Sequence, residues 1–231
     1  GGDKHEEFNA FLDKIADFAN NLKDDAGKPI PVIFRPFHEQ NGSWFWWGAA
    51  FTTTDEYKEI CRYTVEYLRD KKGVRNFLYA YSPGGGFGES EETYLKTYPG
   101  DDYVDILGFD SYYNGEGDSW FESVKTEAKT VSKIADRKKK VAALTEFGYQ
   151  KMKVSGNATK DFFTRLAGAL KSDPDSKKMA YMLTWANFNG VKDSAYVPYH
   201  TGDPEREHEM LPDFRKFYED SYTTFSRDVK G

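Results

Sequence analysis

Cysteine is almost absent from this sequence, which has one, Cys61, in 231 residues. A single cysteine excludes a disulfide within the chain and a cysteine-rich metal site. No apolar run approaches the ~20 residues that a membrane-spanning helix needs, so we expect no membrane span. An excess of basic residues is missing too, since the formal net charge is −6. An acidic chain repels phosphate backbones, and we therefore expect no nucleic-acid partner.

Several common catalytic motifs are also missing. The glycine run at residues 84–88 (GGGFG) has neither the spacing of a dinucleotide fingerprint nor the lysine of a phosphate-binding loop. There is no H-E-x-x-H motif; His5 and His208 are isolated, so we expect both at the surface and predict no metal site. No serine lies in a G-x-S-x-G elbow, which disfavours a serine hydrolase.

Helical and strand patterns alternate along the chain. Apolar residues recur at helical spacing over residues 5–24, 54–71, 91–98, 119–136, 158–172 and about 212–220. Short, nearly continuous apolar runs, typical of strands buried on both faces, lie at residues 30–37, 76–82, 103–110, 140–146 and 179–185. Residues 111–118 and 186–210 are predicted loops. This alternation predicts a parallel α/β fold with no linker inside it.

Two parallel architectures fit this pattern, an open doubly wound sheet and a (β/α)8 TIM barrel. Polar and aromatic residues follow directly after the predicted strands, among them Glu39, Asp110, Glu146 and Trp185. A barrel gathers all its strand ends at one face, where its active site lies, whereas an open sheet uses a single crevice. We therefore favour the barrel, although only five of eight strands are visible and the chain opens with a helix.

The most unusual segment is RPFHEQNGSWFWWG, residues 35–48. A predicted strand leads into it, and Glu39 follows beside His38 and a group of tryptophans. Apolar surroundings raise the pKa of a carboxyl group, which suits a general acid at neutral pH. The rings offer platforms for the apolar faces of sugars. The alternative is a structural glutamate paired with Arg35 beside an aromatic core.

A second carboxylate, Glu146, ends the apolar run VAALT. A charged group at the end of a buried strand must be paired, hydrated or functional. Retaining glycoside hydrolysis requires two carboxylates facing one bond, the first as acid and then base, the second as nucleophile. Glu39 and Glu146 end predicted strands that are three apart, and such strand ends can converge across the mouth of a barrel.

The string RPFHEQNGSWFWWG resembles the acid/base motif of glycoside hydrolase family 26, a group of retaining (β/α)8 enzymes dominated by β-mannanases. The resemblance covers nearly all of the chain. It implies Glu39 as the acid/base on barrel strand 4 and Glu146, in LTEFGY, as the nucleophile on strand 7. It implies no cofactor, and it places Tyr112 against the nucleophile and Trp185 under the sugar at the −1 site. The implied substrate-binding residues are His38, Trp44, Asp110, Tyr112 and Trp185.

The resemblance also implies which part of the barrel is present. If residues 30–37 are strand 4, residues 1–231 form one catalytic barrel domain that supplies strands 4 to 8. We expect strands 1–3 in a separate fragment or segment that would be a partner of this chain. The expected reaction is hydrolysis of β-1,4-mannosidic bonds in mannan, galactomannan or glucomannan. A polysaccharide substrate implies export, so we expect a secreted or extracytoplasmic location, in the periplasm or at the cell surface.

Two other functions stay open. A β-1,3-xylanase or mixed-linkage β-glucanase of the same family would share these motifs, because the motif residues serve the catalytic region that such enzymes have in common. A non-catalytic carbohydrate-binding remnant is favoured by the missing strands and opposed by the presence of both glutamates. Replacement of Glu146 by alanine should abolish turnover in an enzyme and change little in a binding protein.

Overall fold

The computed structural model describes residues 2–115, 117–188, 195–203, 205 and 207–229. Its five strands are all parallel and lie in the order β1-β2-β3-β4-β5. Their bounds are Val32–Phe34, Phe77–Tyr81, Ile106–Tyr113, Val141–Tyr149 and Met182–Thr184. Every strand pairs with its neighbour in the chain, as in a barrel wall, whereas the strand order of a doubly wound sheet reverses. The sheet is a half-barrel, and the predicted (β/α)8 fold class is confirmed for this part of a barrel.

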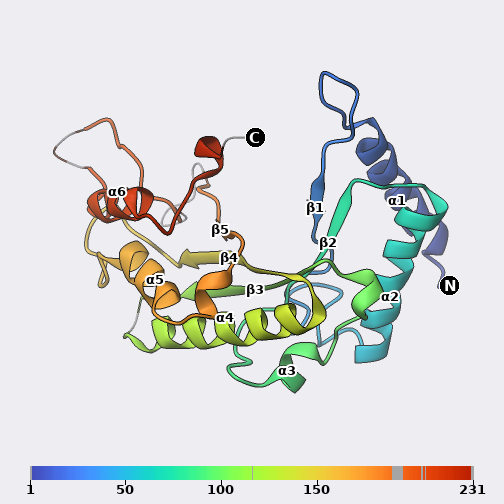
Figure 1. Cartoon of the computed structure of the whole chain (residues 1–231), viewed down its shortest axis with the longest axis horizontal. Coiled ribbons are helices and arrows are strands. Elements are labelled where there is room, and N and C mark those ends of the chain that lie inside the picture. The colour runs from blue at the N-terminus through green and yellow to red at the C-terminus, as the bar shows by residue number, and fades with distance from the viewer. Residues whose placement is uncertain (1, 116, 189–194, 204, 206, 230–231) are drawn as a thin grey trace.

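Helices connect the strands. They are α1 (His5–Asn21), α2 (Thr54–Glu66), α3 (Glu91–Leu95), α4 (Ser119–Lys138), α5 (Phe162–Lys171) and α6 (Leu211–Glu219). A π-helical turn at Tyr67–Lys71 extends α2, and short 3-10 turns lie at Asp101–Tyr103, Ser176–Lys178 and Ser226–Asp228. Figure 1 shows α1 and α2 beside β1 and β2, and α4 and α5 along one side of β3 and β4. Among the described residues, no helix has the length and hydropathy that a membrane crossing requires.

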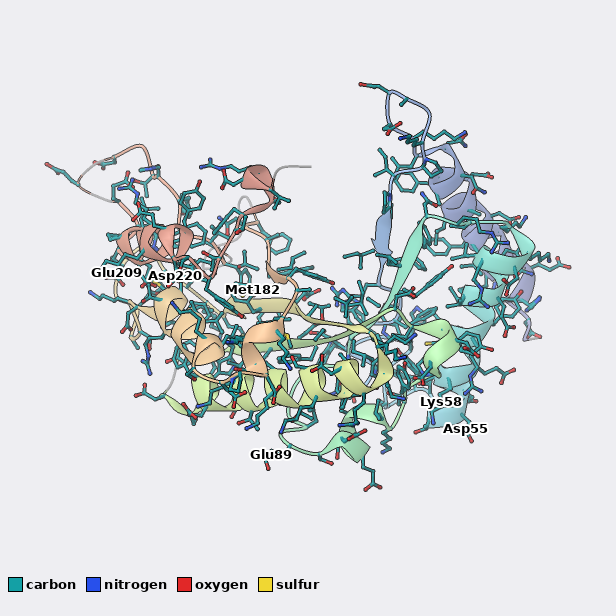
Figure 2. The ribbon with its side chains drawn as sticks, in the orientation of Figure 1. Asp55, Lys58, Glu89, Met182, Glu209 and Asp220 are labelled. Carbon is teal, nitrogen blue, oxygen red and sulfur yellow. The ribbon has the colours of Figure 1, made fainter. Side chains whose placement is uncertain are left out.

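Aromatic rings fill much of the main core, which lies between the sheet and its helices (Figure 2). Phe162 of α5 is fully buried and packs on Tyr113 of β3 and Tyr149 of β4, with ring centroids 5.6 and 5.5 Å away. Much of the 17% aromatic content therefore stabilises the fold and does not face a ligand. A smaller core joins α1 to the π-helical turn through Leu12, Ala16, Ala19, Leu68 and Val74.

The other side of the sheet carries apolar side chains that no described element covers. Ile33 of β1 and Leu78 of β2, partners in register, are each 44% exposed, and Leu183 of β5 is 46% exposed. β1 pairs only with β2, and β5 only with β4, so both edge strands keep an edge that no described strand occupies. In Figure 1 the described ribbon lies mainly on the helix-covered side of the sheet.

Two strands run further than predicted, and β1, predicted at residues 30–37, ends earlier, at Phe34. β3 continues through Tyr113, so residues 111–113, predicted as loop, pair with residues 147–149 of β4. β4 likewise runs three residues beyond Glu146. The serine and glycines of these segments suggested turns. However, Tyr113 and Tyr149 pack ring to ring in the core, 5.0 Å apart, and this contact favours the extended backbone.

The prediction that His208 lies at the surface was also wrong. Its side chain is buried, its Nδ1 accepts a hydrogen bond from the Met210 N–H, and its ring packs against Tyr199. His5 is exposed, as predicted. Part of the predicted loop 186–210, namely residues 189–194, 204 and 206, lies outside the described residues.

Thr53 closes the start of α2 with a reciprocal pair of hydrogen bonds. Its hydroxyl accepts from the Glu56 N–H (3.2 Å), and the Glu56 carboxylate accepts from the Thr53 N–H (2.8 Å). We expect Thr53→Ala to lower the free energy of unfolding by about 1 kcal/mol, because it removes this capping box. Denaturant unfolding followed by circular dichroism measures the loss. The control, Thr54→Ala inside the helix, should change stability by less than about 0.5 kcal/mol; equal losses would contradict the capping role.

Candidate active site

All seven site residues predicted from sequence border one cavity of about 830 Å³. Glu39 and Trp44 come from the loop after β1, Tyr112 from β3, Glu146 from β4, and Trp185 from the residue after β5. The full lining is His38, Glu39, Asn41, Gly42, Trp44, Phe45, Gly84, Gly85, Asp110, Tyr112, Glu146, Gln150, Trp185 and Tyr196. The C-terminal halves of parallel strands meet here, which is where barrel enzymes carry their active sites.

A strained turn aims Glu39 at this cavity. Phe37 and Glu39 both have left-handed backbones, with φ of 54° and 52°. Non-glycine residues rarely adopt such angles, and they do so where surrounding contacts hold them. Here the Tyr57 hydroxyl donates to the Phe37 carbonyl (2.9 Å), and the Glu39 N–H donates to the Ser82 carbonyl (2.8 Å).

The Glu39 carboxyl has the surroundings of a proton donor. Trp44 Nε1 donates to Glu39 Oε2 at 3.0 Å. Burial is the main cause that raises the pKa of Glu39; the negative charge of Glu146 adds to it, and the Trp44 hydrogen bond opposes it. His38, next in the chain, packs against Phe45, and burial followed by the nearby Arg35 charge lowers the pKa of the imidazole. His38 is therefore neutral at neutral pH.

Both oxygens of the Glu146 carboxylate have donors. The Tyr112 hydroxyl donates to Oε2 at 2.6 Å, and Arg35 Nη2 contacts Oε1. Burial, followed by the adjacent Glu146 charge, raises the pKa of Tyr112, so its hydroxyl stays protonated and remains a donor. These are the surroundings of a carboxylate held in one orientation.

Asp110 borders the same cavity, and protein groups surround its carboxylate. Its side chain is fully buried, and it contacts Arg35 Nη1 at 3.0 Å, Ser82 Oγ at 2.9 Å and Thr145 Oγ1 at 2.7 Å. Burial raises the pKa of Asp110 to about 7, against the opposing effects of Arg35 and the two hydroxyls. Asp110 thus borders the cavity, but its side chain is enclosed and contacts Arg35.

Comparison with known proteins identifies the family. The model for glycosyl hydrolase family 26 matches residues 1–189. The chain belongs to glycosyl hydrolase family 26. A mannan endo-1,4-β-mannosidase of Bifidobacterium adolescentis is 47% identical over 94% of the chain and 22% of its own length. The chain thus spans about a fifth of that relative.

Solved structures agree with this assignment. The catalytic domain of a Bacillus sp. JAMB-750 GH26 endo-β-1,4-mannanase is 49% identical, with a TM-score of 0.94, and the match covers all of this chain and 60% of that one. A modular endo-β-1,4-mannanase of Cellulomonas fimi is 45% identical, with a TM-score of 0.90 over all of this chain and 49% of that one.

Sequence reasoning missed the role of Arg35 in this family 26 site. Arg35 was considered only as a partner for Glu39, but it contacts Asp110 and Glu146 instead. One signal was available: an arginine directly after a buried strand needs carboxylate partners, and two other predicted strands carried them. Tyr196 and Gln150 were missed as well. Tyr196 packs over Gly148, where a Cβ would lie 2.4 Å from its ring, and no sequence pattern marks that contact.

His38, Asp110 and Glu146 place donor atoms within 4.8 Å of one another, close enough for a metal ion. Arg35 already contacts both carboxylates and supplies the compensating positive charge. We therefore assign Asp110 and Glu146 to a carboxylate–guanidinium network with Arg35.

The raised pKa of Asp110 predicts a pH-dependent stability. A carboxyl whose folded pKa lies above its unfolded value costs stability once it ionises, so its contribution falls as pH rises from about 4 to about 7. The free energy of unfolding of the native protein, minus that of Asp110→Asn, should therefore decrease over this range by an amount on the order of a few kcal/mol. Denaturant titrations of both proteins at about pH 4.5, 6 and 8 measure this difference in the free energy of unfolding. A difference that grows with pH would mean that Arg35 outweighs burial.

Proposed function

We propose that this chain is the catalytic part of a retaining β-mannanase that hydrolyses β-1,4-mannosidic bonds in mannan, galactomannan or glucomannan. The observation that carries the proposal is a pair of carboxyl groups in one cavity with different partners. Glu39 has a neutral indole donor and a raised pKa, which suits an acid. Glu146 faces a guanidinium and a phenolic donor, which suits an anionic nucleophile.

The reaction would proceed in two displacements. In the first, a Glu146 oxygen attacks the anomeric carbon while Glu39 gives its proton to the departing glycosidic oxygen, and a glycosyl-enzyme forms. In the second, Glu39, now a carboxylate, takes a proton from water as that water attacks the same carbon and releases Glu146. Two inversions give net retention, and the second step restores the protonated Glu39.

Aromatic groups support a sugar substrate. Trp44 is 65% exposed and borders the cavity beside Glu39, and Trp185 borders it next to β5. Rings with one free face suit stacking on a pyranose. Mannan is supported over other polymers by the relatives, since the similar proteins of Bifidobacterium, Bacillus and Cellulomonas are named for activity on β-1,4-mannan.

Product release from soluble β-1,4-mannan is the main test, with β-1,3-xylan and mixed-linkage glucan in parallel. We expect manno-oligosaccharides from mannan and from neither other polymer. NMR should detect the β-anomer as the first product. Activity on another polymer alone would keep the mechanism and replace the substrate. Sugar binding without any hydrolysis would favour a carbohydrate-binding protein.

The two carboxylates should differ in how their loss affects rate. Glu146→Ala should abolish turnover, because no nucleophile remains. Glu39→Gln should lower kcat by roughly 10²- to 10⁴-fold on mannan, the usual contribution of a general acid. The control is Glu91→Gln, an exposed carboxylate on α3 that contacts Arg137 far along the chain. Rates that remain near those of the native protein in either active-site variant would contradict the assigned roles.

Gly42 gives a more indirect test. A Cβ at this position would lie 2.3 Å from the Trp44 ring, so Gly42→Ala must displace the ring that hydrogen-bonds to Glu39. We expect kcat/KM on mannan to fall about tenfold or more, the equivalent of one hydrogen bond to a charged or charge-developing group. Gly168→Ala is the matched control, because a Cβ there meets no atom within 4 Å. An unchanged kcat/KM in Gly42→Ala would remove Trp44 from the mechanism.

We further propose that three more parallel strands, the N-terminal part of the barrel, cover the exposed face of this sheet. The apolar residues Ile33, Leu78 and Leu183 support this, and so does a cavity of about 550 Å³ along β5, lined largely by apolar groups such as Phe147 and Met182. Unpaired strand edges and exposed apolar faces promote aggregation, and native proteins usually cover them. Three additional strands between β5 and β1 would complete an eight-stranded barrel.

A mixing experiment tests this partner. The first three β/α units of the Bifidobacterium relative, made as a separate polypeptide, should form a one-to-one complex with this chain and reduce its binding of the apolar dye ANS. Leu78→Asp should prevent the complex, whereas Asp55→Asn on exposed α2 should not. Undiminished dye binding with the native chain would refute the proposal.

We propose, finally, a secreted or extracytoplasmic location, because polysaccharides do not cross membranes. Fractionation of cells that make the full-length protein, followed by immunodetection, tests it; recovery only with cytoplasmic markers would refute it.

A further inference from the structure

Two buried hydroxyls next to the site, Ser82 and Thr145, take no part in the two displacements. We propose that Asp110 is a positioning residue, which these two hydroxyls hold in place. Because Asp110 and Glu146 share the Arg35 guanidinium, Asp110 sets how strongly Arg35 binds the nucleophile Glu146. This inference rests on the proposed function. It assigns Asp110 to the nucleophile's support and not to the sugar.

The guanidinium fork couples the two carboxylates. Arg35 Nη1 donates to Asp110 Oδ2 and to Ser82 Oγ, both at 3.0 Å, and Nη2 contacts Glu146 Oε1. The fork is rigid and planar, so its orientation toward one carboxylate fixes its orientation toward the other. One partly buried cation thus pairs with two anions, and the strength of each pairing depends on the charge of the other anion.

A β-bulge builds this arrangement. Phe109 pairs with Leu144 and Asp110 pairs with Glu146, so Thr145 is the extra residue on β4. Adjacent strand residues normally face opposite sides, and a bulge changes their aim. Thr145 can therefore contact Asp110 while Glu146 faces the cavity. Gly108 makes room, because a Cβ there would lie 2.4 Å from Thr145 Cγ2.

The groups around Asp110 can hydrogen-bond to its carboxyl in both the protonated and the ionised form. Ser82 Oγ, Thr145 Oγ1 and Asp110 Oδ1 form a triangle with sides of 2.7, 2.7 and 2.9 Å. Three short contacts need three protons for a closed ring of hydrogen bonds, and the hydroxyls supply two. A proton on Asp110 completes the ring. Without it, Asp110 accepts from both hydroxyls and from Arg35. The pKa of about 7 places the exchange between these states near neutrality.

The other titratable groups near Asp110 leave Arg35 as its cation. His38 and Glu39 face it from the loop after β1, Tyr112 from β3, Glu146 from β4, and Tyr181 from the residue before β5. His38 is neutral at neutral pH and both tyrosines stay protonated. Protonation of Asp110 therefore leaves the full Arg35 charge to Glu146, which weakens Glu146 as a nucleophile.

Variants at Asp110 and Thr145 separate positioning from sugar binding. On mannan, Asp110→Asn should lower kcat about tenfold or more at pH 7, because Arg35 then pairs with Glu146 alone, while KM stays within about twofold. Thr145→Val keeps the side-chain shape but loses one donor to the charged form of Asp110, so the acidic limb of kcat should move up by about half a pH unit or more. Thr145→Ser, which keeps the hydroxyl, should restore the native profile. A raised KM with unchanged kcat in Asp110→Asn, or equal profiles for Val and Ser, would overturn the proposal.

A measurement that needs no turnover tests the positioning role of Asp110 independently of the proposed mannanase function. The carboxyl ¹³C resonance of Asp110, assigned by its loss in Asp110→Asn, should titrate at higher pH in Thr145→Val and in Ser82→Ala than in the native protein. Thermal unfolding checks that each variant is folded, and Ser82→Ala replaces Thr145→Val if the latter is not. An upward shift in a protein that cleaves no mannan would refute only the mannanase function. An unshifted resonance would refute the positioning role.

Discussion

The partly buried Arg35 guanidinium, with its single positive charge between Asp110 and Glu146, is the interaction on which this site depends. Two carboxylates this close would repel each other, and a low-polarity interior would drive one of them to take up a proton. Arg35 compensates both, and the contact requires the ends of β1, β3 and β4 to lie at one level. The parallel register of the half-barrel aligns these strand ends, so the charge balance of the site depends on the geometry of the fold.

The loop after β1 divides its aromatic residues between two tasks. Phe45 and Trp47 stack on each other with centroids 4.4 Å apart, and Trp47 Nε1 bonds to the His38 carbonyl, so these rings support the loop. Trp44 turns outward to Glu39 and the cavity. The same aromatic composition that suits sugar binding therefore also supplies the scaffold that holds Glu39, and Gly42 leaves the space that Trp44 occupies.

Sequence patterns predicted the order of helices and strands because periodicity and strand hydrophobicity are local properties. They predicted less well where a distant contact decides the backbone. β3 and β4 run three residues further than their composition suggests, since Tyr113 and Tyr149 pack together in the core. His208, isolated in the sequence, was predicted at the surface, but its side chain is buried and its ring packs against Tyr199. The seven predicted site residues come from four separate segments of the chain, and their convergence on one cavity follows from the parallel strand order.

The sequence by itself determined the family, the parallel α/β class and the two carboxylates, because a long motif and a strand that ends in a charged group are visible without coordinates. Only the tertiary structure decided which partner each carboxylate has. Arg35 lies four residues from Glu39 in the chain but 111 residues from Glu146, and it pairs with the latter. Chain distance does not predict such a pairing, because the sheet brings β1 and β4 to a common end and the bulge after Phe109 sets which side chains face Arg35 there.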